Sequence, residues 1–168
     1  MNRKEKISIY ISSVYHRNHN DTEIKKIREL TKYICGIFNI KNAQISISIV
    51  NDSQMVELNQ TALGKNTKTD VISFDLSDDI DPENHKNDNI ANKNESEKVF
   101  DITINADRAE REARKRGHSQ IAELALYLTH GLLHNLGCND DTPQNSRKMH
   151  QKEDDILQQA GFGIVYKN

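Results

Sequence analysis

Four short stretches of the chain carry the hydrophobic pattern of β-strands. Isoleucine alternates with polar residues over 7–11 and again over 45–49, which is the period-two pattern of a strand with one buried face. Apolar residues are also dense over 70–76 and 99–105, between polar flanks. We therefore predict four strands.

Most of the remaining apolar residues recur every three or four positions, a spacing typical of amphipathic helices. This spacing predicts helices over 22–38, about 106–116, 119–135 and roughly 144–160. A further short helix should begin at a cap formed by Asp52 or Ser53 and end near Gly64, because glycine readily terminates helices.

The segment 119–135 is apolar on nearly every side, so we expect a central, buried helix there. Four strands interspersed with about five helices indicate an α+β domain, with the helices packed on a small mixed four-stranded sheet. Residues 77–98 hold almost no large apolar side chains and cannot bury enough surface to offset their ordering entropy. We expect a mobile polar loop at 77–98. Because neither flank looks complete alone, residues 1–168 are predicted to form a single domain.

Composition restricts the possible functions. The 168 residues are 35% hydrophobic and 29% charged, without an apolar run that could span a membrane or serve as a secretory signal. Cys35 and Cys138 form no CxxC pair and are expected to stay reduced in a cytoplasm. A formal net charge of −2 does not favour nucleic-acid binding by the molecule as a whole, so any RNA contact must come from a local patch.

The strongest chemical signal is the stretch THGLLHNLGCNDD, residues 129–141. His130 and His134 are four positions apart, so on a helix their imidazoles lie one turn apart on the same face and can share a metal ion. Gly137 should end the helix and return Asp140 or Asp141 to the metal. Two imidazoles and one carboxylate leave a position for water, as in catalytic zinc sites.

A purely structural explanation competes with this one, because two histidines four apart occur by chance and a buried histidine can simply be hydrogen-bonded. The apolar helix around the pair and the carboxylates that follow favour the metal site. Position 131 is glycine, so the HExxH pattern of zinc peptidases is missing and peptidase activity is disfavoured. Cys138 is expected to be a packing residue and His118 a surface residue.

The stretch HGLLHNLGCND, residues 130–140, resembles the motif His-Gly-x-Leu-His-Leu-x-Gly-Tyr-Asp-His of the YbeY family, which are bacterial metal-dependent endoribonucleases of ribosomal RNA maturation. Other family blocks follow the family's order along the chain. They are LNQTAL at 58–63, TDVISF at 69–74, FDITIN at 100–105 and the helix around 147–157.

The resemblance implies a metal-dependent endoribonuclease that acts on single-stranded RNA in ribosomal RNA maturation and ribosome quality control. It implies one divalent metal per chain, preferably zinc, at His130, His134 and Asp140, where Asp140 replaces the family's third histidine. Expected partners are ribosomal RNA and the small ribosomal subunit or its assembly proteins, in the cytoplasm.

The family's arginine, expected to face an RNA phosphate, falls at Leu63. Lys65 or Lys68 could supply positive charge nearby, and we expect Lys65 to take over part of this role. Asp70 and Ser73 lie in the strand that the family places beside the metal and are expected to orient the substrate. The structural alternatives are that Asp70 caps a turn and that Ser73 is a buried strand residue.

The helix predicted at about 106–116 is the best local basic patch. Its candidate RNA-binding residues are Arg108, Arg111, Arg114 and Lys115. The alternative is a solvated helix face on which Glu110 and Glu112 pair some of the charges. A rival function also remains open: a non-catalytic or weakly catalytic ribosome-assembly factor that keeps the fold and the metal site.

Overall fold

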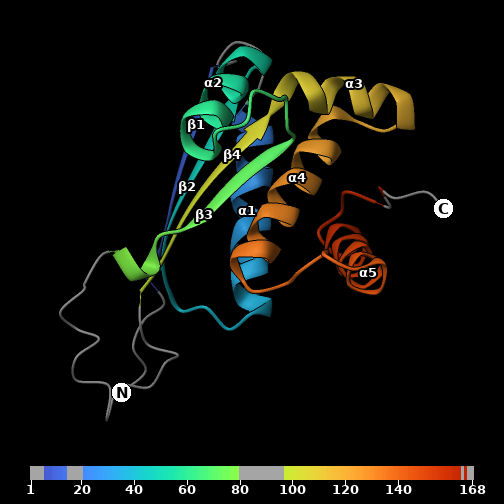
Figure 1. The fold of residues 1–168 in the computed structure, drawn as a ribbon. Coiled ribbons are helices and arrows are strands. Elements are labelled where there is room, and N and C mark those ends of the chain that lie inside the picture. The colour runs from blue at the N-terminus through green and yellow to red at the C-terminus, as the bar shows by residue number, and fades with distance from the viewer. Residues whose placement is uncertain (1–5, 15–20, 80–96, 164, 166–168) are drawn as a thin grey trace, which may run out of the picture.

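The computed structural model describes residues 6–14, 21–79, 97–163 and 165, and Figure 1 shows its elements. The strands are β1 (Lys6–Ser13), β2 (Asn42–Val50), β3 (Val71–Asp75) and β4 (Lys98–Asn105). The helices are α1 (Asp21–Ile37), α2 (Asp52–Leu63), α3 (Ala106–Arg116), α4 (Gln120–Asn135) and α5 (Pro143–Gln159), with a short 3-10 turn η1 (Ser77–Asp79).

The four strands form one sheet in the order β1-β2-β4-β3. β1, β2 and β4 are parallel to one another, and β3 runs antiparallel to β4 along the other edge. In register, Ile45 of β2 lies between Ile9 of β1 and Phe100 of β4, and all three side chains are buried. Next to them, Tyr10 and Ser46 are exposed, so this part of the sheet has one buried face, whereas β4 is buried on both faces from Ile102 to Asn105. The predicted α+β fold with a mixed sheet is confirmed.

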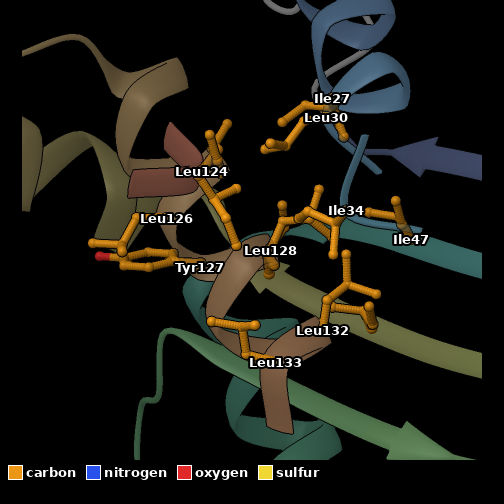
Figure 2. Close-up of a cluster of buried hydrophobic side chains, with 14 of the residues drawn as sticks. Ile27, Leu30, Ile34, Ile47, Leu124, Leu126, Tyr127, Leu128, Leu132 and Leu133 are labelled. Carbon is orange, nitrogen blue, oxygen red and sulfur yellow. The ribbon is translucent and has the colours of Figure 1, made fainter. Parts of the chain in front are cut away.

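The buried face of the sheet is covered by α1 and α4, and α5 packs against α4 farther from the sheet (Figure 1). Figure 2 shows leucines of α4, among them Leu124 and Leu128, packed against Ile27 and Ile34 of α1. Eleven of the sixteen residues of α4 are buried, so the prediction of a central buried helix is confirmed. No helix in the described ranges is long and apolar enough to cross a membrane.

Gly131 lets α4 lie very close to the sheet. A Cβ atom at this position would come within 3.0 Å of Val71 Cγ2 and 3.2 Å of Ser73 Cβ, which is closer than side chains normally pack. Four residues farther along, Asn135 Nδ2 donates a hydrogen bond to the carbonyl oxygen of Phe74, 3.1 Å away. The second half of α4 is thereby fixed against β3.

One local prediction, the cap of α2, needs correction. The cap of α2 is Asn51, not Asp52 or Ser53: its side chain accepts from the backbone N–H of Gln54, and the Gln54 side chain accepts from the N–H of Asn51. At the ends of the polar loop predicted at 77–98, Ser77–Asp79 form the 3-10 helix η1 and β4 begins at Lys98. Residues 80–96 lie outside the described part of the chain.

Candidate metal centre

The two predicted histidines share one face of α4. His130 Nε2 and His134 Nε2 are 3.0 Å apart, and the two rings meet edge to face with their centroids 4.5 Å apart. Both side chains are partly exposed, at 24% and 33%. The pair therefore lies at the border between the core and solvent, so a substrate could reach a metal ion bound there.

A turn after α4 brings Asp140 to the same place. Gly137 adopts a left-handed φ of 85°, and the N–H of Cys138 bonds back to the carbonyl of Leu133. Asp140 Oδ2 then lies 3.9 Å from His130 Nε2, and Oδ1 lies 3.8 Å from His134 Nε2. One atom from each of these three residues lies within 4.8 Å of the others.

The neighbouring carboxylate, Asp141, is used differently. Its Oδ1 accepts a hydrogen bond from Asn145 Nδ2, 2.8 Å away, in the first turn of α5. Thr142 caps the same turn through Asn145 N–H. The geometry thus separates the two candidates that sequence reasoning left open, and favours Asp140 as the ligand.

The spacing of these donors fits a tetrahedral transition-metal ion. Ligand bonds of 2.0–2.2 Å at tetrahedral angles place ligand atoms roughly 3.3 Å apart. The two imidazole nitrogens are 3.0 Å apart, and one Asp140 oxygen lies within 4.8 Å of both, so a movement of Asp140 toward the histidines would complete the site. Neutral imidazoles with one carboxylate suit zinc and also admit other divalent ions of the first transition row.

Glu153 of α5 supports the site from the interior, and sequence reasoning missed it. Its side chain is fully buried, and its Oε1 lies 2.7 Å from His130 Nδ1. A carboxylate that accepts the Nδ1–H of an imidazole directs Nε2 toward the metal and makes it a better ligand. The signal was present: Glu153 occupies a core position in the series Met149, Glu153, Ile156 and Leu157.

The charges around His130 alter its protonation. Burial by itself lowers the pKa of His130, but the hydrogen bond to Glu153 and the nearby carboxylates of Asp70 and Asp140 outweigh burial and raise the pKa. This acidic environment favours a positive charge at the imidazoles, which a divalent cation would supply.

Asp70, which precedes β3, and Ser73 of β3 both lie near α4, and their roles toward a substrate stay predictions. Ser73 packs beside Gly131, and Asp70 lines a cavity of about 120 Å³ together with His130. Asp70 Oδ1 also accepts from Val71 N–H, 2.9 Å away, so the predicted turn-capping role is present alongside the location near the metal. Ser73 is half-buried.

Lys65 follows Gly64, the left-handed residue that ends α2, and its side chain is exposed. Lys65 is not among the residues that line the cavity beside His130. Its role in catalysis stays a prediction. Leu63, where the family's arginine was expected, is 47% exposed.

Most of the predicted basic patch on α3 takes part in ion pairs. Arg111 forms two hydrogen bonds with Asp52, at 2.9 and 3.0 Å. Arg114 pairs with Glu110, and Lys115 Nζ lies 2.7 Å from Glu112 Oε1. The pairs of Arg114 and Lys115 are exposed and open readily, whereas Arg111 is held by the mostly buried Asp52. RNA binding by these residues stays a prediction.

Arg108, the fourth residue of the patch, donates to the carbonyl of Lys68 at 3.3 Å and lines the cavity beside His130. The expectation that His118 is a surface residue was wrong. Its side chain is only 13% exposed, and its Nε2 lies 3.0 Å from Glu123 Oε2 in the interior.

The fold and this site define an α+β domain with a candidate transition-metal centre on its central helix. The chain belongs to the endoribonuclease YbeY family, whose model matches residues 12–161. A protein named endoribonuclease YbeY from Bacillus velezensis is 35% identical over 140 residues, which cover 83% of this chain and 85% of the relative. The protein of that name from Geobacillus kaustophilus is 30% identical over 161 residues, covering 95% and 99%.

A solution structure from Thermotoga maritima has the same fold. The two structures align with a TM-score of 0.56 at 20% sequence identity, over 92% of this chain and 88% of the other. The family resemblance noted in the sequence is confirmed.

Proposed function

We propose that this protein is a metal-dependent endoribonuclease that cleaves single-stranded segments of ribosomal RNA. The observation that carries the proposal is the group formed by His130, His134 and Asp140, with Glu153 behind it, in a member of the YbeY family. The relatives named above are called endoribonucleases, and this supports the same reaction class here.

Each residue of the site would have a separate role. His130, His134 and Asp140 would hold the metal, which supplies Lewis-acid activation of water and of the phosphate. Glu153 fixes the ring of His130 by accepting its Nδ1–H. Asp70 lines the cavity next to His130 and would orient an attacking water or a ribose hydroxyl.

Ser73, beside Gly131, is a second candidate for holding the substrate, through its hydroxyl group. Lys65 would approach the phosphate from the segment that follows α2, as a point charge. Zinc is the metal that we propose, at one ion per chain.

Ribosomal RNA, the small ribosomal subunit and its assembly proteins are the proposed partners, in maturation and quality control of ribosomes. The proposed location is the cytoplasm, where bacterial ribosomes are made. The family membership supports these assignments.

The test is cleavage of a single-stranded ribosomal RNA fragment by purified protein, with its metal removed and then restored. We expect cleavage to stop with a chelator and to return with zinc. The double variant His130→Ala/His134→Ala should lose about one metal ion per chain by elemental analysis, and cleavage with it. Equal metal content in the wild type and in this variant would refute the site.

A second candidate function is that of an assembly factor with little or no catalysis. Leu63 favours it, because the side chain at the end of α2 is apolar and 47% exposed where the family resemblance expects an arginine. Under this alternative, metal-loaded wild-type protein binds ribosomal RNA or the small subunit and leaves the RNA intact. The same cleavage assay therefore separates the two candidates.

A further inference from the structure

A cavity at the corner between α3 and α4 opens beside the metal centre. It measures about 120 Å³, and we call it the corner pocket. Figure 1 shows that α3 and α4 meet at an angle at this point. The corner pocket is lined by Asp70, Arg108, Glu112, Arg116, Leu126, Tyr127 and His130.

The two arginines of the corner pocket are the groups that could bind a phosphate. Arg108 and Arg116 both belong to α3 and are eight positions apart, a little more than two helical turns, so they lie on the same side of the helix. Guanidinium groups bind phosphate oxygens through parallel N–H donors. His130, a candidate metal ligand, forms part of the same wall. A phosphate in the corner pocket would thus lie next to a second phosphate at the metal.

The carboxylates of the corner pocket are already hydrogen-bonded. Glu112 Oε1 lies 2.7 Å from Lys115 Nζ, and this contact lowers the pKa of Glu112. Asp70 accepts from Val71 N–H at 2.9 Å and from the Thr69 hydroxyl at 3.1 Å. Hydrogen bonds thus fix the carboxylates of Glu112 and Asp70. The groups that would bind an anion in the corner pocket are the guanidinium groups of Arg108 and Arg116.

Arg116 is held from behind by a buried acid. Glu123 is fully buried, and its Oε1 lies 3.2 Å from Arg116 Nη1, while Oε2 lies 3.0 Å from His118 Nε2. Burying a carboxylate is costly unless cations pair with it. The side chain of Arg116 is nevertheless 36% exposed, although its Nη1 atom, which faces Glu123, is buried. Pre-positioning of this kind reduces the entropy lost on binding.

We propose that the corner pocket binds the RNA phosphate next to the one at the metal centre. Arg108 and Arg116 are its ligands, and Glu123 is a positioning residue that holds Arg116 in place. This inference rests on the proposed function, because it assigns a subsite to the same substrate.

The first experiment measures RNA affinity, not cleavage. The metal-loaded protein is titrated with a fluorescent 2′-O-methyl oligoribonucleotide at several salt concentrations, and the anisotropy gives the dissociation constant. Each phosphate contact to a single strand contributes about 0.7 to the slope of log affinity against log salt. We expect Arg116→Ala and Arg108→Ala each to reduce the slope by about 0.7 and to weaken binding about tenfold. The control Lys25→Ala, a 75% exposed lysine on α1, should match the wild type.

Arg116→Ala leaves the buried carboxylate of Glu123 without its arginine partner, and this loss can unfold the junction between α3 and α4. The double variant Arg116→Ala/Glu123→Gln removes both charges together and serves as the second test. It should fold, retain its metal by elemental analysis, and show the same reduced slope. If the folded double variant and Arg108→Ala keep the wild-type slope, the arginines only join α3 to α4 and the proposal is wrong.

A second experiment locates the phosphate. A single methylphosphonate, which is neutral, is moved along the oligonucleotide one linkage at a time. In the wild type, one linkage beside the phosphate that the metal holds should be sensitive, and in the arginine variants this sensitivity should disappear. Equal sensitivity in the wild type and the variants would overturn the assignment. Because both experiments measure binding, a protein that binds in this way and cleaves nothing refutes only the proposed catalysis.

Discussion

Replacing Glu153 by glutamine tests whether the buried carboxylate tunes the metal centre. Glu153 is fully buried and its Oε1 lies 2.7 Å from His130 Nδ1. The amide oxygen of Glu153→Gln still accepts the Nδ1–H but carries no charge, so His130 Nε2 becomes a poorer ligand. Loss of a carboxylate behind a metal-binding histidine typically costs 10–100-fold in metal affinity, which is about 1.4–2.7 kcal/mol.

We expect Glu153→Gln to fall near the lower end of that range and Glu153→Ala near the upper end, because alanine also leaves the ring unsupported. The assay is a titration of the metal-loaded protein with a competing chelator of known affinity. Asp155→Asn is the matched control, since it makes the same chemical change on the same helix at an exposed position.

The melting temperature gives an independent measurement. A metal present at a hundred times its dissociation constant stabilises the fold by about 2.7 kcal/mol, or roughly 5–10 °C for a domain of this size. Glu153→Gln should need a higher metal concentration to reach the same stabilisation. If Glu153→Gln and Asp155→Asn both bind metal like the wild type, the carboxylate behind His130 has no role in metal affinity and the reasoning fails.

Three further predictions concern neighbouring residues. Asp140→Ala should lower metal content while Asp141→Ala leaves it unchanged, and elemental analysis showing the reverse would reassign the ligand. Leu63→Arg should raise metal-dependent RNA cleavage and Lys65→Ala should lower it, by up to about a hundredfold for one charged contact, in initial-rate assays. Asp52→Asn should cost about 2 kcal/mol at pH 7, measured by thermal melting, because charge-assisted hydrogen bonds are lost. The pKa of Asp52 is held far below its usual range, mainly by its arginine partner, so this difference should persist down to about pH 4 and shrink only in stronger acid.

The strands and helices were predictable because the spacing of apolar residues along the chain depends only on local sequence. The alternation around Ile45 and the apolar run of α4 gave the sheet and the central helix, and the spacing of His130 and His134 gave the centre of the site. Contacts between distant elements were not predictable in this way. The approach of Glu153 to His130 joins two helices and depends on how α5 packs.

The cap of α2 was predicted wrongly for a different reason. Several polar residues at the start of α2 qualify as caps, and only tertiary contacts decide among them. Asn51 caps the helix because Asp52 is engaged elsewhere: its carboxylate binds Lys68 and Arg111 and accepts from Asn105 Nδ2. Similarly, His118 looked exposed because its partner, Glu123, lies inside a helix whose pattern is otherwise apolar.

The tight contact at Gly131 restricts which residue can follow the first histidine of the metal site. Zinc peptidases carry a catalytic glutamate directly after the first histidine of their helix. Here that position faces the sheet, and even a methyl group would meet Val71 and Ser73 at 3.0 and 3.2 Å. A glutamate would require the side chains of Val71 and Ser73 to move, or α4 to shift together with its histidines. Close packing against these side chains therefore disfavours a glutamate at position 131, so we expect a general base to come from another element.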